Sequence, residues 1–223
     1  ALEIAALERI KAHEPTLQSD PIARRELAAR MQILLEQIDN EVHSVLNDSD
    51  WVCLNNKTHY QNKTSSEVAS LLADEIYSCT PKIKNELINK DKVSAVGVVA
   101  SKNLLRAMMD HEQSENLNFK GYPPEVAVYK SVLQLNNIHG KEGNEYKFLD
   151  FENYKDDGLR QMASSFYNLL DSNSDRKVNL TEIMDIWANP PYGIKNGIAP
   201  TLAVAFYLAR SAKIALFVDE IFT

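Results

Sequence analysis

A rigid turn that leads into a strongly apolar helix is the feature that most constrains the fold of this chain. The segment 190–202 holds three prolines and two glycines, and the apolar run that follows it ends at Arg210. Pro190 and Pro191 stop the preceding helix, and Gly193 and Gly197 permit backbone angles that other residues resist. The pattern predicts a rigid connection between two helices of one compact unit.

The last third of the chain has the element order of a winged helix. Helices are predicted over 158–170, 181–188 and 200–210, with Val178 as a one-residue strand after the first and a hairpin that begins at Lys213. The sequence therefore predicts a mainly α protein. Its fold is expected to be a helical bundle at 1–150 followed by a winged-helix-like unit with short β strands at 151–223, truncated at the wing.

The third helix of that unit raises the question of DNA contact, because in nucleic-acid-binding versions this helix enters the major groove. Residues 201–209 offer few groups that can read base edges, so the donors of note nearby are Lys195, Asn196 and Arg210. We expect these three residues to carry any DNA contact. A structural or protein-contact role for the unit is the alternative.

Helical periodicity dominates the first half of the chain. A short helix is predicted over 2–13, and Asp20-Pro21 supplies an N-cap followed by proline at the first helical position of a long helix. That helix carries an apolar residue at every third or fourth position: Leu27, Met31, Leu34, Ile38, Val42 and Val45. The stripe suits a coiled coil or a core, and its length of about three heptads favours a core.

The middle of the chain predicts more helices with two short strands between them. Helices are expected from about 65 to 77, from 94 to 111 and from 124 to 135, with a short one after Pro81. A short strand is expected at 50–54, and a strand or extended connector at 146–151. A soft domain boundary is placed between 135 and 157.

Charge, cysteine content and chain ends narrow the function classes. A net charge of −7 argues against a broad nucleic-acid footprint but is compatible with a local basic patch. Cys53 and Cys79 have neither the number nor the spacing of a disulfide framework or zinc site, which indicates a reducing, cytoplasmic compartment. No apolar run has membrane length, so no membrane partner is expected. Both ends resemble cuts through structured protein, and we expect a fragment of a larger chain.

Residues 171–182 follow the oxygen pattern of an EF-hand loop. Asp171, Asn173, Asp175 and Glu182 stand at positions one, three, five and twelve. Position six normally needs glycine, whereas Arg176 costs roughly 1 kcal/mol or more in a left-handed conformation and brings a cation to the metal. A degenerate calcium loop is therefore the alternative prediction. The favoured one is a polar connection in which Asp171 and Thr181 act as helix caps.

No catalytic motif is recognisable elsewhere. The sequence lacks a Gly-x-x-x-x-Gly-Lys phosphate loop, a dinucleotide fingerprint and a His-Glu-x-x-His motif. The five histidines, His139 among them, fall in different predicted elements without ligand spacing, and each is expected to be a surface or partly buried imidazole. We predict no catalytic residue and no cofactor in this part of the protein.

Three segments in a fixed order carry a family resemblance. They are Asp20–Leu27, Thr80–Asn89 with Tyr77 before it, and Pro190–Pro200. Together they resemble very large bacterial P-loop ATPases associated with phage-defence loci of the BREX kind, in the helical and winged-helix region downstream of the nucleotide-binding core. The resemblance covers most of the chain. It implies a parent protein that uses ATP and Mg²⁺, in which this region transmits or regulates.

The resemblance also implies a contact surface toward a neighbouring domain or subunit. Tyr77, Asn85 and Glu86 are the expected participants, and Tyr192 belongs to the distinctive Pro-Pro-Tyr-Gly segment. The alternative is that Asn85 caps a turn while Glu86 faces solvent. Two functional hypotheses follow: a non-catalytic module of a larger ATPase that contacts protein or DNA, and a calcium-binding helical protein.

Overall fold

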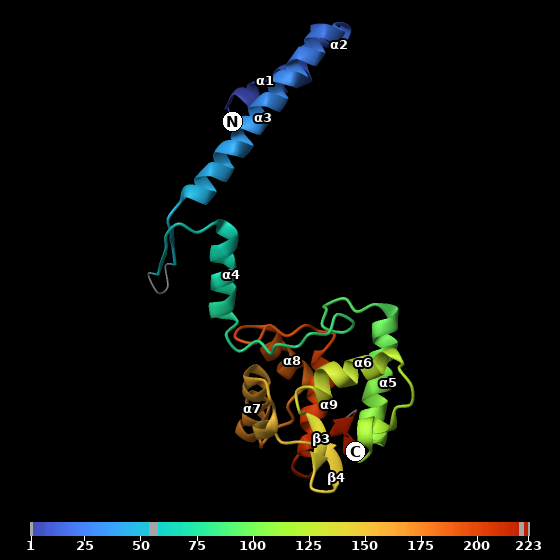
Figure 1. The fold of residues 1–223 in the computed structure, drawn as a ribbon. Helices are drawn as coiled ribbons and strands as arrows, with labels where there is room; N and C mark the ends of the chain where they lie inside the picture. The colour runs from blue at the N-terminus through green and yellow to red at the C-terminus, as the bar shows by residue number, and fades with distance from the viewer. Residues whose placement is uncertain (1, 54–57, 219–220, 223) are drawn as a thin grey trace. The chain divides into compact units, whose positions relative to one another are not determined.

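The computed structural model describes residues 2–53, 58–218 and 221–222. The chain divides into two compact units, residues 1–73 and 74–223. Both are mainly helical, and the strands form two-stranded antiparallel pairs (Figure 1). The prediction of a mainly α protein with short β strands is confirmed at this level.

The first unit begins with three helices. They are α1 (Leu2–His13), α2 (Pro15–Ser19) and α3 (Pro21–Asp48). The Asp20 carboxylate accepts hydrogen bonds from the backbone N–H of Ile22 at 2.8 Å and of Ala23 at 3.1 Å, which confirms the predicted N-cap. A short hairpin of β1 (Trp51–Val52) and β2 (His59–Tyr60) follows, and then α4 (Ser65–Ile76), whose last turn crosses into the second unit.

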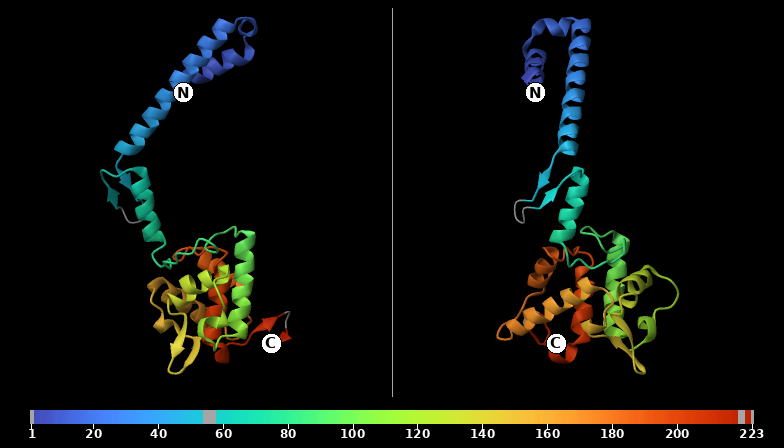
Figure 2. Two further views of the ribbon diagram at one scale, coloured as in Figure 1. Left: turned by 45° about the vertical axis from the view of Figure 1, so that its right-hand side comes forward. Right: turned by 60° about the vertical axis from the view of Figure 1, so that its left-hand side comes forward.

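The apolar stripe of α3 is only partly covered. α1 lies beside the first part of α3, with Arg30 and Glu3 paired at 2.6 Å, and the later turns of α3 extend past it (Figure 2). No residue of α3 whose side chain is described is fully buried. The favoured expectation of core packing is thus not met along α3, because a 12-residue helix cannot cover a 28-residue one.

The second unit is a helical body with two small hairpins. Its helices are α5 (Ala95–Asp110), η1 (Glu115–Asn118), α6 (Pro124–Val128), the π-helical η2 (Tyr129–Gln134), η3 (Phe151–Asn153), α7 (Asp157–Ser172), α8 (Leu180–Ala188), α9 (Ala199–Ala209) and η4 (Ser211–Lys213). Its strands pair as β3 (His139–Glu142) with β4 (Glu145–Phe148) and β5 (Phe217–Val218) with β6 (Ile221–Phe222).

The apolar helix predicted at 200–210 is α9, and it forms the centre of this unit's core. Leu202, Ala205 and Phe206 are fully buried, and the Phe206 ring meets that of Trp187 edge to face at 5.6 Å between centroids. A helix that is apolar on all sides needs neighbours on all sides. The sequence of α9 is therefore explained by burial, although Val204, Tyr207 and Leu208 remain partly exposed.

The division at 73/74 differs from the predicted boundary between 135 and 157. Side chains of α5 and η2, such as Leu104 and Val132, share one core with Leu159 of α7 and with α9. These long-range contacts join the two sides of the predicted boundary. The polar composition after Leu135 indicated a boundary, but Asn136, Ile138 and His139 are buried there, so the chain stays within the core of the second unit.

Two further predictions for the second unit need correction. The short helix after Pro81 is absent: residues 81–85 have no regular secondary structure, the Ile83 N–H donates to the Pro81 carbonyl at 2.9 Å, and turns follow at 86–88. Val178 lies in no strand among the described residues. The observed order is thus α7, α8, α9, η4 and the β5–β6 hairpin, and the hairpin predicted from Lys213 begins only at Phe217, after η4.

Candidate functional site

Two irregular segments of the second unit run side by side and form a surface that we call the joint. One is 77–92, between α4 and α5, and the other is 189–197, between α8 and α9 (Figure 1). The N–H of Cys79 donates to the carbonyl of Pro191 at 3.1 Å, and that of Gly197 donates to the carbonyl of Lys90 at 3.0 Å. The joint holds six of the seven predicted contact residues: Tyr77, Asn85, Glu86, Tyr192, Lys195 and Asn196.

Glycines allow the two segments to approach closely. A Cβ atom on Gly197 would lie 2.3 Å from the carbonyl oxygen of Ile88 and 2.7 Å from that of Lys90, so no larger residue fits there. Gly193 has a φ of +64°, and its α-carbon faces the ring of Tyr77, whose Cδ1 would lie 2.8 Å from an added Cβ. The two glycines of segment 190–202 therefore reflect backbone packing inside the joint.

Asn85 is a structural residue of the joint. Its side-chain oxygen accepts hydrogen bonds from the N–H groups of Leu87 and Ile88, both at 3.1 Å, and its Nδ2 donates to Ser131 Oγ at 2.8 Å. Glu86 is exposed. The structure matches the alternative interpretation, in which Asn85 caps a turn and Glu86 faces solvent. Asn89 Nδ2 donates to the carbonyl of Ile83 at 3.1 Å and closes the loop between them.

Lys195 and Asn196 anchor the second segment to the first through one carboxylate. Lys195 Nζ lies 3.2 Å from Asp91 Oδ2, and the N–H of Asn196 donates to Asp91 Oδ1 at 3.4 Å. Both charged side chains are more than half exposed. An exposed pair of this kind contributes little to stability, about 0–1 kcal/mol, so a competing anion can displace Asp91 at small cost.

Arg210 lies outside the joint and is engaged elsewhere. Its guanidinium holds both oxygens of Asp150, with Nη2 at 2.8 and 2.9 Å, and it lies 4.1 Å above the ring of Tyr167 and 5.0 Å from that of Phe151. The predicted DNA contact through Arg210 needs correction, because its donors are directed into the molecule. Asp150 lies 60 residues away, and no local pattern links the two.

A set of exposed lysines gathers at the joint, and the sequence analysis did not single it out. In the irregular run 81–85, Pro81 and Ile83 are buried, while Lys82 and Lys84 are exposed. The Asn89–Ile83 bond brings the other end of the loop, with Lys90 and Lys92, toward them, and the Gly197–Lys90 bond adds Lys195. The same two segments carry only two acidic residues, Glu86 and Asp91. At the edge of the joint, the Asp156 carboxylate accepts a hydrogen bond from the Lys82 backbone N–H.

The 171–182 region is a helix-to-helix connection closed by its own ion pair. Arg176 binds Glu182 with Nη2–Oε2 at 2.9 Å, and Glu182 Oε1 also accepts from the Asn179 N–H at 3.1 Å. These two hydrogen bonds, first that of Arg176, hold the pKa of Glu182 below its ordinary value. The expected twelfth calcium ligand is thereby committed to a capping box at the start of α8.

The helix caps predicted for this loop also need correction. Asp171 lies within the last turn of α7, and Asn179, not Thr181, caps α8. Asn173 donates to the carbonyl of Leu169 and accepts from Arg176. The calcium-ligand role of Asp171, Asn173 and Asp175 therefore rests on the sequence pattern alone. Among the described residues, no group of three or more His, Cys, Asp or Glu is arranged to hold a metal ion.

His139 is buried, whereas a surface or partly buried imidazole is predicted from the sequence. Its Nε2 lies 2.7 Å from the Glu112 carbonyl oxygen, which can only accept, so Nε2 carries the proton and Nδ1 accepts from the Tyr129 hydroxyl at 2.9 Å. Burial lowers the pKa of His139 below its ordinary value of 6.5. With both ring nitrogens occupied, this imidazole holds η2 and β3 in place.

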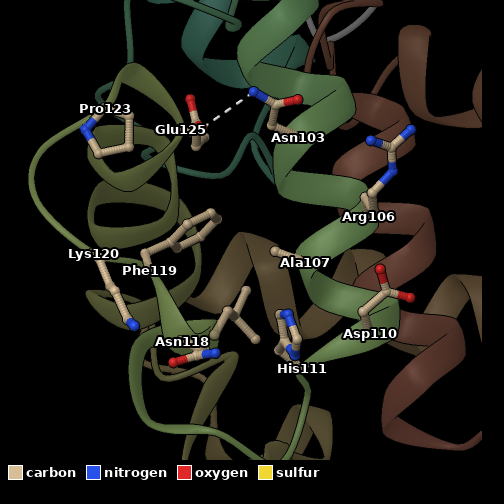
Figure 3. Close-up of a pocket in the computed structure, with 11 residues that line it drawn as sticks. Asn103, Arg106, Ala107, Asp110, His111, Asn118, Phe119, Lys120, Pro123 and Glu125 are labelled. Atoms are coloured by element: carbon tan, nitrogen blue, oxygen red, sulfur yellow. Dashed lines mark hydrogen bonds between the residues drawn. The ribbon is translucent and has the colours of Figure 1, made fainter.

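A shallow hollow of about 410 Å³ lies between α5, η1 and α6. Figure 3 shows Asn103 of α5 reaching Glu125 of α6, a hydrogen bond of 3.2 Å, with Phe119 and Lys120 on the near side of the loop. Arg106 points away from Phe119 and Lys120 (Figure 3). The hollow has mixed charge and no converging set of donors, so its chemistry does not single out a ligand class.

No protein-family model, characterised protein or solved structure matches this chain. Within the described ranges, no helix combines the length and the apolar character needed to cross a membrane.

Proposed function

We propose that this chain is a non-catalytic helical and winged-helix-like module of a larger cytoplasmic ATPase, and that its joint contacts the phosphate backbone of DNA. The ATPase setting, with phage defence as its context, is supported by the three segments that resemble such proteins. Two of them, around 77–89 and 190–200, pack together as the joint. ATP and Mg²⁺ belong to the parent protein in this proposal.

The single observation that carries the DNA contact is the lysine set of the joint. The two segments of the joint carry five exposed lysines and only two acidic residues, Glu86 and Asp91, in a chain whose overall net charge is −7. Clustered lysines bind phosphates by releasing condensed counterions, without reading base edges. Because α9 is buried, contact through the joint is expected to be independent of base sequence, unlike groove reading by a recognition helix.

Two triple variants test the proposal in the full 223-residue chain. Lys84→Gln, Lys90→Gln and Lys92→Gln together remove joint lysines, and Lys102→Gln, Lys141→Gln and Lys155→Gln remove three exposed lysines elsewhere as a control of equal charge. The joint variant should bind duplex DNA more weakly and lower the slope of log K against log salt by about 2 to 3 units. The control variant should change both quantities much less.

Equal effects of the two triple variants would overturn the joint as the DNA-contacting surface. If DNA does not retain the unsubstituted 223-residue chain at low salt, a module that contacts protein and not DNA is favoured. Arg210→Met provides a third arm: it should lower stability while leaving the salt slope nearly unchanged, because the Arg210 side chain faces Asp150 and Tyr167.

A further inference from the structure

The first unit has helices but almost no core of its own. Among its described residues, only Tyr60 and Val68 are buried hydrophobic residues, and α1 contains none. Most helical stability in proteins comes from packing an apolar face, not from intrinsic helix propensity. A 28-residue helix such as α3 therefore needs more covering surface than α1 and α2 supply.

The uncovered surface is the second half of the α3 stripe. Leu27, Met31, Leu34 and Ile38 are half-buried, whereas Val42 is 50% and Val45 is 65% exposed. Leu35 and Leu46 widen the same face and are also exposed. Both views of Figure 2 show the later turns of α3 without a neighbouring helix in the first unit. The face continues the stripe that α1 covers, so one longer partner helix would extend an existing packing surface.

Charge along α3 is divided between its two halves. The first half, 21–34, holds Arg24, Arg25 and Arg30 with one glutamate, whereas the second half, 35–48, holds four carboxylates. Arg30 already attracts an acid, Glu3 of α1, at 2.6 Å. A helix with one basic and one acidic half is complementary to a second copy of itself only when the two run in opposite directions.

We infer that α3 pairs antiparallel with α3 of a second copy of this chain. In that arrangement the first half of each α3, with Arg24 and Arg30, runs along the half of the partner's α3 that holds Asp39 and Glu41. Val42 and Val45 of each copy then pack beside the first half of the partner's α3, and the two α1–α3 pairs form a four-helix arrangement. A parallel pair would place the basic halves opposite each other and the acidic halves opposite each other, so both ends of the pair would be destabilised by charge repulsion.

The first experiment measures oligomeric state by sedimentation across the micromolar range. The chain should be a dimer, and Val42→Asp with Val45→Asp should raise the dimer dissociation constant at least about 30-fold, as expected for losing a central apolar contact. Asn40→Asp with Asn47→Asp is the matched control, because it adds the same charge to the opposite face of α3. A monomeric parent chain, or equal effects of the two variants, overturns the inference.

Charge reversal tests the electrostatic half of the inference. Glu36→Lys, Asp39→Lys and Glu41→Lys make α3 basic throughout, and Arg24→Glu, Arg25→Glu and Arg30→Glu make it acidic throughout. Each triple variant should dissociate as a homodimer, and an equimolar mixture of the two should recover a heterodimer. Homodimers that withstand both reversals would show that the charge pattern of α3 does not select the partner. Circular dichroism of each variant separates dissociation from unfolding of the helix.

Spin labels test the direction of pairing. A label at Asn47→Cys, with Cys53→Ser and Cys79→Ser, lies on the face of α3 opposite the stripe. With a rise of 1.5 Å per residue, an antiparallel pair centred on the middle of α3 places the two labels about 40 Å apart, and a parallel pair about 20 Å. The shorter distance overturns the antiparallel arrangement. This outcome is separate from DNA binding, because the joint lies in the second unit.

Discussion

The two units of this chain are built from the same kind of sequence and reach opposite degrees of burial. α3 and α5 both carry apolar residues at helical spacing, yet Leu104 and Met108 of α5 are fully buried while Val42 and Val45 of α3 are largely exposed. The difference lies in the neighbours: α5 is covered by α6 and α9, and α3 by the shorter α1. Helical periodicity thus predicts a helix and the face it will bury, but not whether the same molecule supplies the cover.

The largest expected effect comes from truncating one side chain in each unit and comparing the two losses of stability. Phe206→Ala in α9 should lower the free energy of unfolding by about 3–5 kcal/mol, because it empties a fully buried site against Trp187 and Phe166. Ile33→Ala in α3, at a site 55% exposed and off the stripe, should change it by less than about 0.5 kcal/mol. Urea unfolding followed by Trp187 fluorescence, in a Trp51→Phe background, measures the first effect, and helical circular dichroism measures the second. Comparable losses would show that the first unit has a core of its own.

A smaller effect is expected at the joint. Gly197→Ala forces a Cβ against the carbonyl oxygens of Ile88 and Lys90, so the two segments must separate at a cost of about 1–3 kcal/mol. Gly143→Ala in the β3–β4 turn is a useful control, because its φ of +63° imposes backbone strain with nothing within 4 Å of the added Cβ. Thermal unfolding of both variants measures the difference. If Gly197→Ala leaves the unfolding temperature unchanged, the close approach of the two segments does not require a glycine at 197.

The smallest expected effect is on the stability of the second unit at acidic pH. The pKa of His139 is lowered in the folded chain, so the unfolded chain takes up the proton first as pH falls. The stability contributed by the neutral imidazole is present above pH 6.5 and decreases below it, by at most about 1.4 kcal/mol per pH unit. His139→Gln should flatten this part of the pH profile of urea unfolding. An unchanged profile in His139→Gln would assign the acid sensitivity of the second unit to other groups.

Much of the fold was predictable because its signals are local. Asp20-Pro21 at the start of α3 and the Asn189-to-Pro200 turn before α9 act through the backbone within a few residues, and the structure has helices at both places. The helix predicted after Pro81 failed for a local reason as well, since the Asn85 side chain captures the N–H groups of Leu87 and Ile88 that a helix would need.

The candidate site was predictable only in outline. The sequence alone indicated that 77–86 and 190–196 matter, through their proline, glycine and family-like patterns. It did not place the two segments together, because the Cys79–Pro191 and Gly197–Lys90 hydrogen bonds join residues that are more than 100 positions apart. It also could not separate Lys195, which stays at the surface, from Arg210, which the distant Asp150 draws inward.

The sequence by itself determined where α3 and α9 begin and which faces of the long helices are apolar. Caps, prolines and side-chain periodicity act over a single turn, and these properties need no distant partner. Tertiary structure alone decided which charges remain available. It brings the lysines of 82–92 to Lys195, pairs Arg210 with Asp150, commits Glu182 to Arg176, and leaves the second half of α3 uncovered. Charge availability depends on contacts between residues far apart in the chain, which no local pattern encodes.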